Sequence, residues 1–212
     1  MNGRRLLTLI GLLIGATGLV VQFVISMQAY LAAGRDIPGA LGTFFTYYTI
    51  LTNIVLVLIY LSELTTTPRL ELFRRPIVRA MMAANIALVM IFVYFVLRHL
   101  SVLSGLFLVC DYILHYITPT LYVVWWAAFA RHGTLRLADI PLMLAPTLVY
   151  FLYAMARGAW VREYPYPILN AIELGYLQVL LNAVYMTIGL GLLCVGVILL
   201  DQWLGKRQVA HG

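Results

Sequence analysis

Six apolar runs, separated by short polar turns, constrain the fold of this chain more than any other feature of its sequence. They cover residues 6–31, 41–63, 78–97, 103–130, 140–156 and 175–200. Because an α-helix rises about 1.5 Å per residue, about 20 residues cross the hydrocarbon core of a bilayer, which is about 30 Å thick. A backbone in lipid must satisfy its own hydrogen bonds, which favours helices. The runs therefore predict an all-α polytopic membrane protein, a single-domain bundle of six transmembrane helices over residues 1–212.

The composition agrees with a membrane protein and excludes several other classes. Hydrophobic residues make up 63% of the chain and charged residues 10%, whereas a soluble domain has about 25% charged residues. The formal net charge of +6 comes from arginines in the turns, so we expect no nucleic-acid partner. Cys110 and Cys194 lie within apolar runs and have no second cysteine at metal-ligand spacing. We therefore expect no disulfide, no metal site and no cofactor.

The distribution of basic residues predicts the orientation of the bundle. With both termini in the cytoplasm, the inner segments carry Arg4, Arg5, Arg69, Arg74, Arg75, Arg79, Arg131, Arg136, Lys206 and Arg207. The outer turns then carry Arg35, Arg98, Arg157 and Arg162. Because cytoplasmic loops are enriched in Lys and Arg, this excess predicts six spans with both ends inside.

The first apolar run is longer than the core of a secretory signal, which has about 7–15 apolar residues. We therefore expect it to remain as the first span of an integral protein of the bacterial inner (plasma) membrane. Gly11 and Gly15 form a GxxxG pair within it, and such pairs usually mark a face where two helices pack closely.

The fourth run contains an acid and an imidazole four residues apart, Asp111 and His115. This spacing places both side chains on one face of a helix, and Thr118 follows three residues later. Ionisable groups within hydrocarbon are costly and usually belong to functional sites that face the interior of a bundle. The alternative is a structural hydrogen bond between two helices. The residues alone favour neither interpretation.

Other polar residues occur at a similar depth in the predicted spans. At about 1.5 Å per residue, Thr49 in the second run and His115 in the fourth lie at nearly the same level. Asn53 is one turn from Thr49, while Asn85 and Asn182 lie in the third and sixth runs. Because amides that face lipid are penalised, we expect these residues to share a polar cavity.

This set of residue types is sufficient for acyl transfer. A hydroxyl becomes a good nucleophile when a neighbouring base takes its proton and a third group orients that base. His115 is the candidate base, Asp111 the orienting group and Asn53, Asn85 or Asn182 the oxyanion donor. The candidate nucleophiles are Thr46, Thr49 and Thr52. The alternative for each threonine is a hydroxyl that bonds to its own helix backbone.

Three segments together resemble the androgen-induced-gene family of integral membrane threonine hydrolases. They are Tyr48-Thr49-Ile50-Leu51-Thr52-Asn53, Asp111-Tyr112-Ile113-Leu114-His115-Tyr116-Ile117-Thr118-Pro119, and Gly158-Ala159-Trp160 followed by Tyr164-Pro165-Tyr166-Pro167. The resemblance covers nearly the whole chain.

That resemblance implies an activity and assigns roles to residues. Animal members of the family cleave fatty acid esters of hydroxy fatty acids with one threonine and one histidine. By motif, the histidine corresponds to His115 and the threonine to Thr49, with Thr52 as the alternative. Asp111 stands where the animal proteins carry a neutral amide, so an orienting carboxylate is a departure from the family pattern.

The leading hypothesis is an intramembrane hydrolase whose lipid-ester substrate enters from the surrounding membrane lipids. Tyr112, Tyr116, Tyr150 and Tyr153 are expected to line its cavity. The alternatives are a small transporter or proton-coupled carrier with an Asp111–His115 relay, and a non-catalytic membrane protein. Among the four histidines, His99, His132 and His211 lie outside the middle of the spans, which leaves His115 as the candidate. The sequence carries no signal for an oligomeric state.

Overall fold

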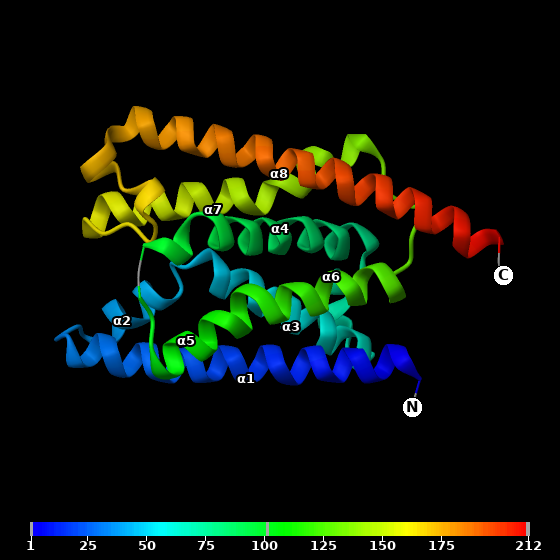
Figure 1. Cartoon of the computed structure of the whole chain (residues 1–212), viewed down its shortest axis with the longest axis horizontal. Helices are drawn as coiled ribbons and strands as arrows, with labels where there is room; N and C mark the ends of the chain where they lie inside the picture. Colours follow the sequence, from blue (N-terminus) through cyan, green and yellow to red (C-terminus); the bar gives the residue numbers. More distant parts are fainter. Residues whose placement is uncertain (1, 101, 211–212) are drawn as a thin grey trace.

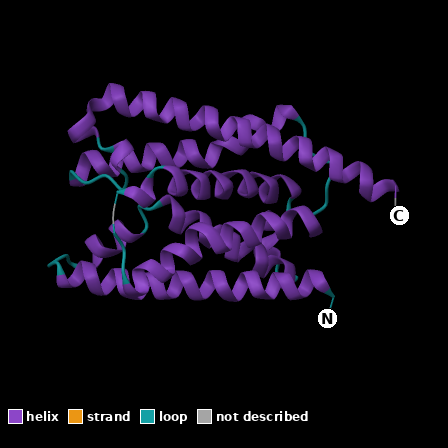
Figure 2. Ribbon diagram, in the orientation of Figure 1, coloured by secondary structure: helices purple, strands orange, loops and turns teal. Residues whose placement is uncertain are grey.

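The computed structural model describes residues 2–100 and 102–210, and helix is the only regular secondary structure in them (Figure 2). His211 lies outside the described residues. The α-helices are α1 (Gly3–Ala32), α2 (Ile37–Phe44), α3 (Tyr48–Leu64), α4 (Pro76–Phe95), α5 (Gly105–Tyr112), α6 (Thr118–Phe129), α7 (Ile140–Val161) and α8 (Ala171–Ala210). A π-helical turn, Ile113–Ile117, joins α5 to α6. Short 3-10 helices cover Pro68–Arg74, Leu97–His99, Leu137–Asp139 and Pro167–Leu169.

The expectation of an all-helical protein with apolar helices of membrane-spanning length is confirmed. Five helices in the described part of the chain are long and apolar enough to cross a membrane. A sixth span results if α2 and α3, which meet at an angle of 74°, together form one. The start of α1 and the end of α8 lie at the same end of the bundle, and α4 lies between these two helices (Figure 1).

The second apolar run differs from the continuous helix that its length predicts. It breaks after Phe44, and Tyr47 adopts an extended conformation before α3 begins. The hydroxyls of Thr43 and Thr46 donate to the carbonyls of Gly39 and Gly42, a type of bond that favours bending. As a result, Thr49 lies in the first turn of α3, whereas a depth estimate based on one straight helix places it well inside a span.

The fourth run is irregular at the turn that carries His115, and Pro119 explains why. The backbone N–H of Thr118 bonds to the carbonyl of Ile113, five residues earlier. The carbonyl of Leu114 therefore loses its α-helical donor, and Pro119 has no N–H to replace it. The side-chain amide of Asn53 donates to this carbonyl at 3.1 Å. Single π-helical turns of this kind occur frequently at functional sites.

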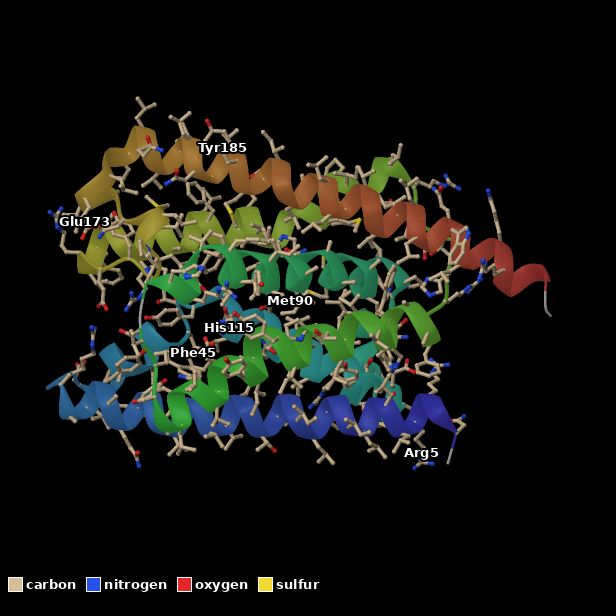
Figure 3. All side chains as sticks on the ribbon, viewed as in Figure 1. Arg5, Phe45, Met90, His115, Glu173 and Tyr185 are labelled. Atoms are coloured by element: carbon tan, nitrogen blue, oxygen red, sulfur yellow. The ribbon has the colours of Figure 1, made fainter. Side chains whose placement is uncertain are left out.

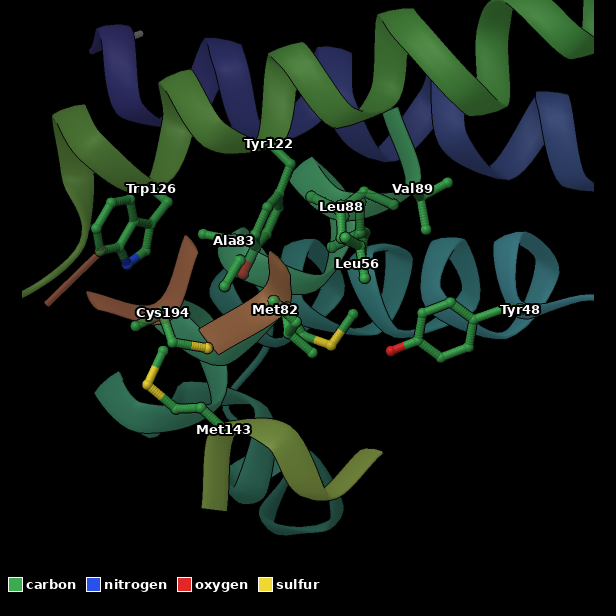
Figure 4. Close-up of a cluster of buried hydrophobic side chains, with 14 of the residues drawn as sticks. Tyr48, Leu56, Met82, Ala83, Leu88, Val89, Tyr122, Trp126, Met143 and Cys194 are labelled. Atoms are coloured by element: carbon green, nitrogen blue, oxygen red, sulfur yellow. The ribbon is translucent and has the colours of Figure 1, made fainter. Parts of the chain in front are cut away.

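Close packing between α1 and α3 fixes the position of α3. Gly11 allows the ring of Tyr60 to approach so closely that a Cβ on Gly11 would lie 2.4 Å from the ring. Tyr60 in turn packs against Tyr122 and Trp125. The main core continues from these residues to α4, α7 and α8, where Met82, Met143 and Cys194 meet (Figure 4).

We expect Gly11→Ala to destabilise the protein, because its new methyl group overlaps the Tyr60 ring and overpacking costs about 1–3 kcal/mol. The measurement is the thermal unfolding midpoint of the purified protein in detergent. Gly196→Ala is the matched control, since nothing lies within 4 Å of a Cβ at that helical position. Equal midpoints for the two variants would contradict the close contact.

Candidate active site

A chain of two hydrogen bonds joins Thr49, His115 and Asp111. The Oγ1 atom of Thr49 lies 3.1 Å from Nε2 of His115, and Nδ1 of His115 lies 2.8 Å from Oδ1 of Asp111. Figure 3 shows His115 in the interior of the bundle. A hydroxyl, an imidazole and a carboxylate in this order have the arrangement of a nucleophile, its base and an orienting group.

The carboxylate determines which imidazole nitrogen is available to Thr49. An ionised carboxylate only accepts hydrogen bonds, so Nδ1 of His115 carries the proton and donates to Asp111. The lone pair of Nε2 then faces the hydroxyl of Thr49 and accepts its hydrogen. The side chains of His115 and Asp111 are 19% and 20% exposed, so both are open to a cavity.

The other candidate threonines are bonded to the backbone. The hydroxyl of Thr52 donates to the carbonyls of Tyr48 and Thr49, and that of Thr46 donates to Gly42. Among the three threonines of this segment, Thr49 is therefore the one whose hydroxyl reaches the imidazole.

The three asparagines that were candidates for oxyanion stabilisation have other hydrogen bonds. Asn53 donates to Thr49 and Leu114 and accepts from Thr118, which ties α3 to the π-helical turn. The amide of Asn85 donates to two backbone carbonyls, and its oxygen accepts from the hydroxyls of Tyr48 and Thr147. Asn182 donates to the carbonyl of Ile168 on the α8 side of the bundle. None of the three lines the two cavities at the site.

Two cavities border Thr49. The first, of about 910 Å³, also contacts Asp111, His115, Tyr112 and Tyr116. The second, of about 530 Å³, lies among apolar side chains of α4, α7 and α8 and includes Tyr150. The residues that line both are Thr49, Val93, Leu97 and Tyr166. Of the tyrosines expected at the site, Tyr153 lines neither cavity and is exposed on α7.

Tyr166 belongs to the site, although the sequence assigned it no role. It lies in the segment between α7 and α8, and its ring packs edge-on against Tyr47. Burial raises the pKa of its phenol, while the nearby side chain of Thr49 and the backbone of Thr49 and Tyr48 oppose that rise. The Tyr164-Pro165-Tyr166-Pro167 sequence was the available signal, but nothing in it indicates which tyrosine turns inwards.

The described residues contain no cluster of three or more His, Cys, Asp or Glu side chains that is able to hold a metal ion. Comparisons with protein-family models, curated proteins and solved structures found no match to this chain. The three segments that carry the family resemblance nevertheless meet at one place, because Thr49, His115 and Tyr166 all line the first cavity.

The contact between Thr49 and His115 is testable without any knowledge of a substrate. In a Cys110→Ala/Cys194→Ala background, we expect Thr49→Cys to react with N-ethylmaleimide at pH 7 about tenfold faster when His115 is present than in Thr49→Cys/His115→Ala, because a neighbouring histidine stabilises a thiolate. Labelling is followed by mass spectrometry of the intact protein. Thr52→Cys serves as the matched control one turn away, and its rate should not depend on His115. Equal rates for the two Thr49→Cys proteins would show that the imidazole does not act on this position.

Proposed function

We propose that this chain is an intramembrane hydrolase of lipid esters, with Thr49 as nucleophile, His115 as general base and Asp111 as the group that orients His115. The observation that carries the proposal is the unbroken chain of hydrogen bonds from Thr49 Oγ1 through the imidazole to Asp111. It lies beside two cavities, one of them largely apolar. The resemblance to the androgen-induced-gene family favours fatty acid esters of hydroxy fatty acids, or similar lipid esters, as substrates.

The reaction proceeds in two halves. Nε2 of His115 takes the hydroxyl proton while Oγ1 of Thr49 attacks the acyl carbonyl, and the resulting tetrahedral intermediate collapses to an acyl-threonine. The alcohol leaves with the proton that His115 has taken. A water molecule, activated by His115 in the same way, then attacks the acyl-threonine, so that one ester and one water give one acid and one alcohol.

The first turn of α3 offers donors for the oxyanion. The first N–H groups of a helix have no partner within it, and α3 has no side-chain cap at this end. The N–H groups of Tyr48 and Thr49 lie beside the nucleophile and near the phenol of Tyr166. Backbone N–H groups of this kind stabilise the charge of a tetrahedral intermediate. We assign the oxyanion to these two N–H groups and Tyr166, in place of the three asparagines.

The membrane placement that fits this function has six spans, with α2 and α3 counted as one, and both termini in the cytoplasm of a bacterial inner membrane. It is supported by the common end of α1 and α8 (Figure 1) and by the excess of basic residues on that side. The partners of the chain are then membrane lipids, and the substrate enters laterally from them.

A proton-coupled carrier with an Asp111–His115 relay is the competing proposal. Such a relay needs two groups that exchange a proton with water or substrate. It gives no role to an alcohol that bonds the second imidazole nitrogen. The Thr49–His115 bond therefore favours the hydrolase.

We expect Thr49→Ala and His115→Ala to lose ester hydrolysis, the latter by about 10²–10⁴-fold, which is the usual contribution of a general base. The assay follows release of fatty acid from a long-chain lipid ester by the purified protein in detergent. Thr52→Ala is the matched control, and it should retain activity because the hydroxyl of Thr52 bonds only to backbone carbonyls. Full turnover in Thr49→Ala would remove Thr49 from the mechanism.

Asp111→Asn tests whether the carboxylate orients the imidazole. An amide at this position is able to donate to Nδ1, which moves the imidazole proton to Nε2 and blocks the base. A loss of kcat of up to about 10⁴-fold is known for such a change in a serine protease. We expect a loss in kcat with little change in KM. Unchanged kcat would show that a neutral amide is sufficient, as the family pattern allows.

A further inference from the structure

The two cavities beside Thr49 differ in their access to the catalytic base. The first contacts Asp111 and His115, whereas the second contacts neither. Thr49 borders both, so the nucleophile lies at the junction of two separate spaces. Tyr166 from the segment between α7 and α8 also borders both and packs close to Thr49.

The second cavity is suited to an apolar chain. None of the described residues that line it is charged. Away from the junction, every hydroxyl that lines it is already hydrogen-bonded within the protein. Those of Tyr48 and Thr147 bond to Asn85, that of Tyr150 to the carbonyl of Thr46, and that of Thr187 to the carbonyl of Ala183. An apolar ligand therefore leaves no polar group there without a partner.

The dimensions of the second cavity also match a chain. Its lining runs along α7 from Pro141 to Phe151, a distance of about 15 Å at 1.5 Å per residue. Side chains of α4 and α8 complete the walls, among them Leu88, Leu180 and Leu190. The volume of about 530 Å³ is within the usual range for small-ligand sites, about 300–1,000 Å³.

The first cavity is more polar and reaches charged groups. Besides Asp111 and His115, it is lined by Gln22, Arg98 and His99. A substrate portion that carries oxygen atoms finds donors and acceptors there, whereas an apolar chain would leave them unpaired.

The chemistry of the proposed reaction then decides which cavity holds the acyl chain and which holds the alcohol portion of the ester. The departing alcohol oxygen has to receive its proton from Nε2 of His115, and His115 faces only the first cavity. The acyl group stays on Thr49 after the alcohol leaves, so its chain occupies the space that remains. We infer that the second cavity is the acyl-chain site and that the first cavity holds the alcohol portion of the ester. This inference rests on the proposed hydrolase function.

Two series of esters test the assignment by kcat/KM in detergent micelles. In the first series the leaving group is always p-nitrophenol, and the acyl chain varies from butanoyl to hexadecanoyl. In the second series the acyl group is always butanoyl, and the alcohol varies from methanol to hexadecanol. Ala145→Phe and Ala183→Phe each narrow the second cavity, from α7 and from α8. We expect both to lower kcat/KM for hexadecanoyl relative to butanoyl by about tenfold or more, because pocket size discriminates between apolar chains on that scale. The alcohol series should be unaffected.

Ser26→Phe is the matched control, because Ser26 lines the first cavity and not the second. It should impair long alcohols and leave the dependence on acyl length unchanged. The reverse result, with acyl length controlled by position 26, would overturn the assignment while leaving the hydrolase intact. If the unmodified protein cleaves no ester in either series, both the function and this inference fail.

A second measurement is independent of kinetics and of how well the variants fold. An alkyl fluorophosphonate with a hexadecyl chain and a terminal diazirine reacts with Thr49 and leaves its chain in the acyl site. We expect photocrosslinks to peptides that contain residues 141–151 or 180–190. Crosslinks to residues 22–30 or 103–112 would place the chain in the first cavity and overturn the inference.

Discussion

The side-chain amide of Asn53 holds together the two segments that form the site. It donates to the carbonyl of Thr49 on its own helix and to that of Leu114 on the π-helical turn. The second carbonyl lacks a backbone donor because Pro119 has no N–H, and within a membrane an unsatisfied carbonyl costs several kcal/mol. Contact with α3 therefore stabilises the irregular turn that carries His115. The hydrogen bond from Asn53 to the Leu114 carbonyl therefore also holds the imidazole of His115 close to Thr49.

The break between α2 and α3 has an analogous role. Breaks in a helix at membrane depth are tolerated where protein groups replace the lost bonds. Here the hydroxyl of Tyr150 donates to the carbonyl of Thr46. The break places the first N–H groups of a helix beside Thr49, whereas a continuous helix would have used these groups in its own hydrogen bonds. Two irregularities, one on each helix, thus place Thr49 beside the imidazole of His115 and beside the N–H groups of a helix start.

The packing around these irregular segments is regular and tight, which lets them keep one geometry. Small residues of α1 face α3 and the π-helical turn. Gly11 admits the ring of Tyr60 on α3, and a Cβ on Gly18 would lie 2.6 Å from the side chain of Ile113 in the π-helical turn. The GxxxG pattern indicated a packing face, but the partner of that face became visible only in the fold.

The sequence by itself determined the helical class, the apolar segments and the pairing of Asp111 with His115, because each follows from length or from spacing within one helix. It also narrowed the candidate nucleophile to three threonines, among which the family resemblance favoured Thr49 over Thr52. Only the tertiary structure showed that the hydroxyl of Thr49 reaches His115, whereas those of Thr46 and Thr52 bond to the backbone. It also showed that the three asparagines lie away from the two cavities and that Tyr166 lines both. Those features depend on contacts between residues far apart in the chain and on two helix breaks. Local periodicity carries no information about either, because a break is stable only when a distant group satisfies the backbone that it exposes.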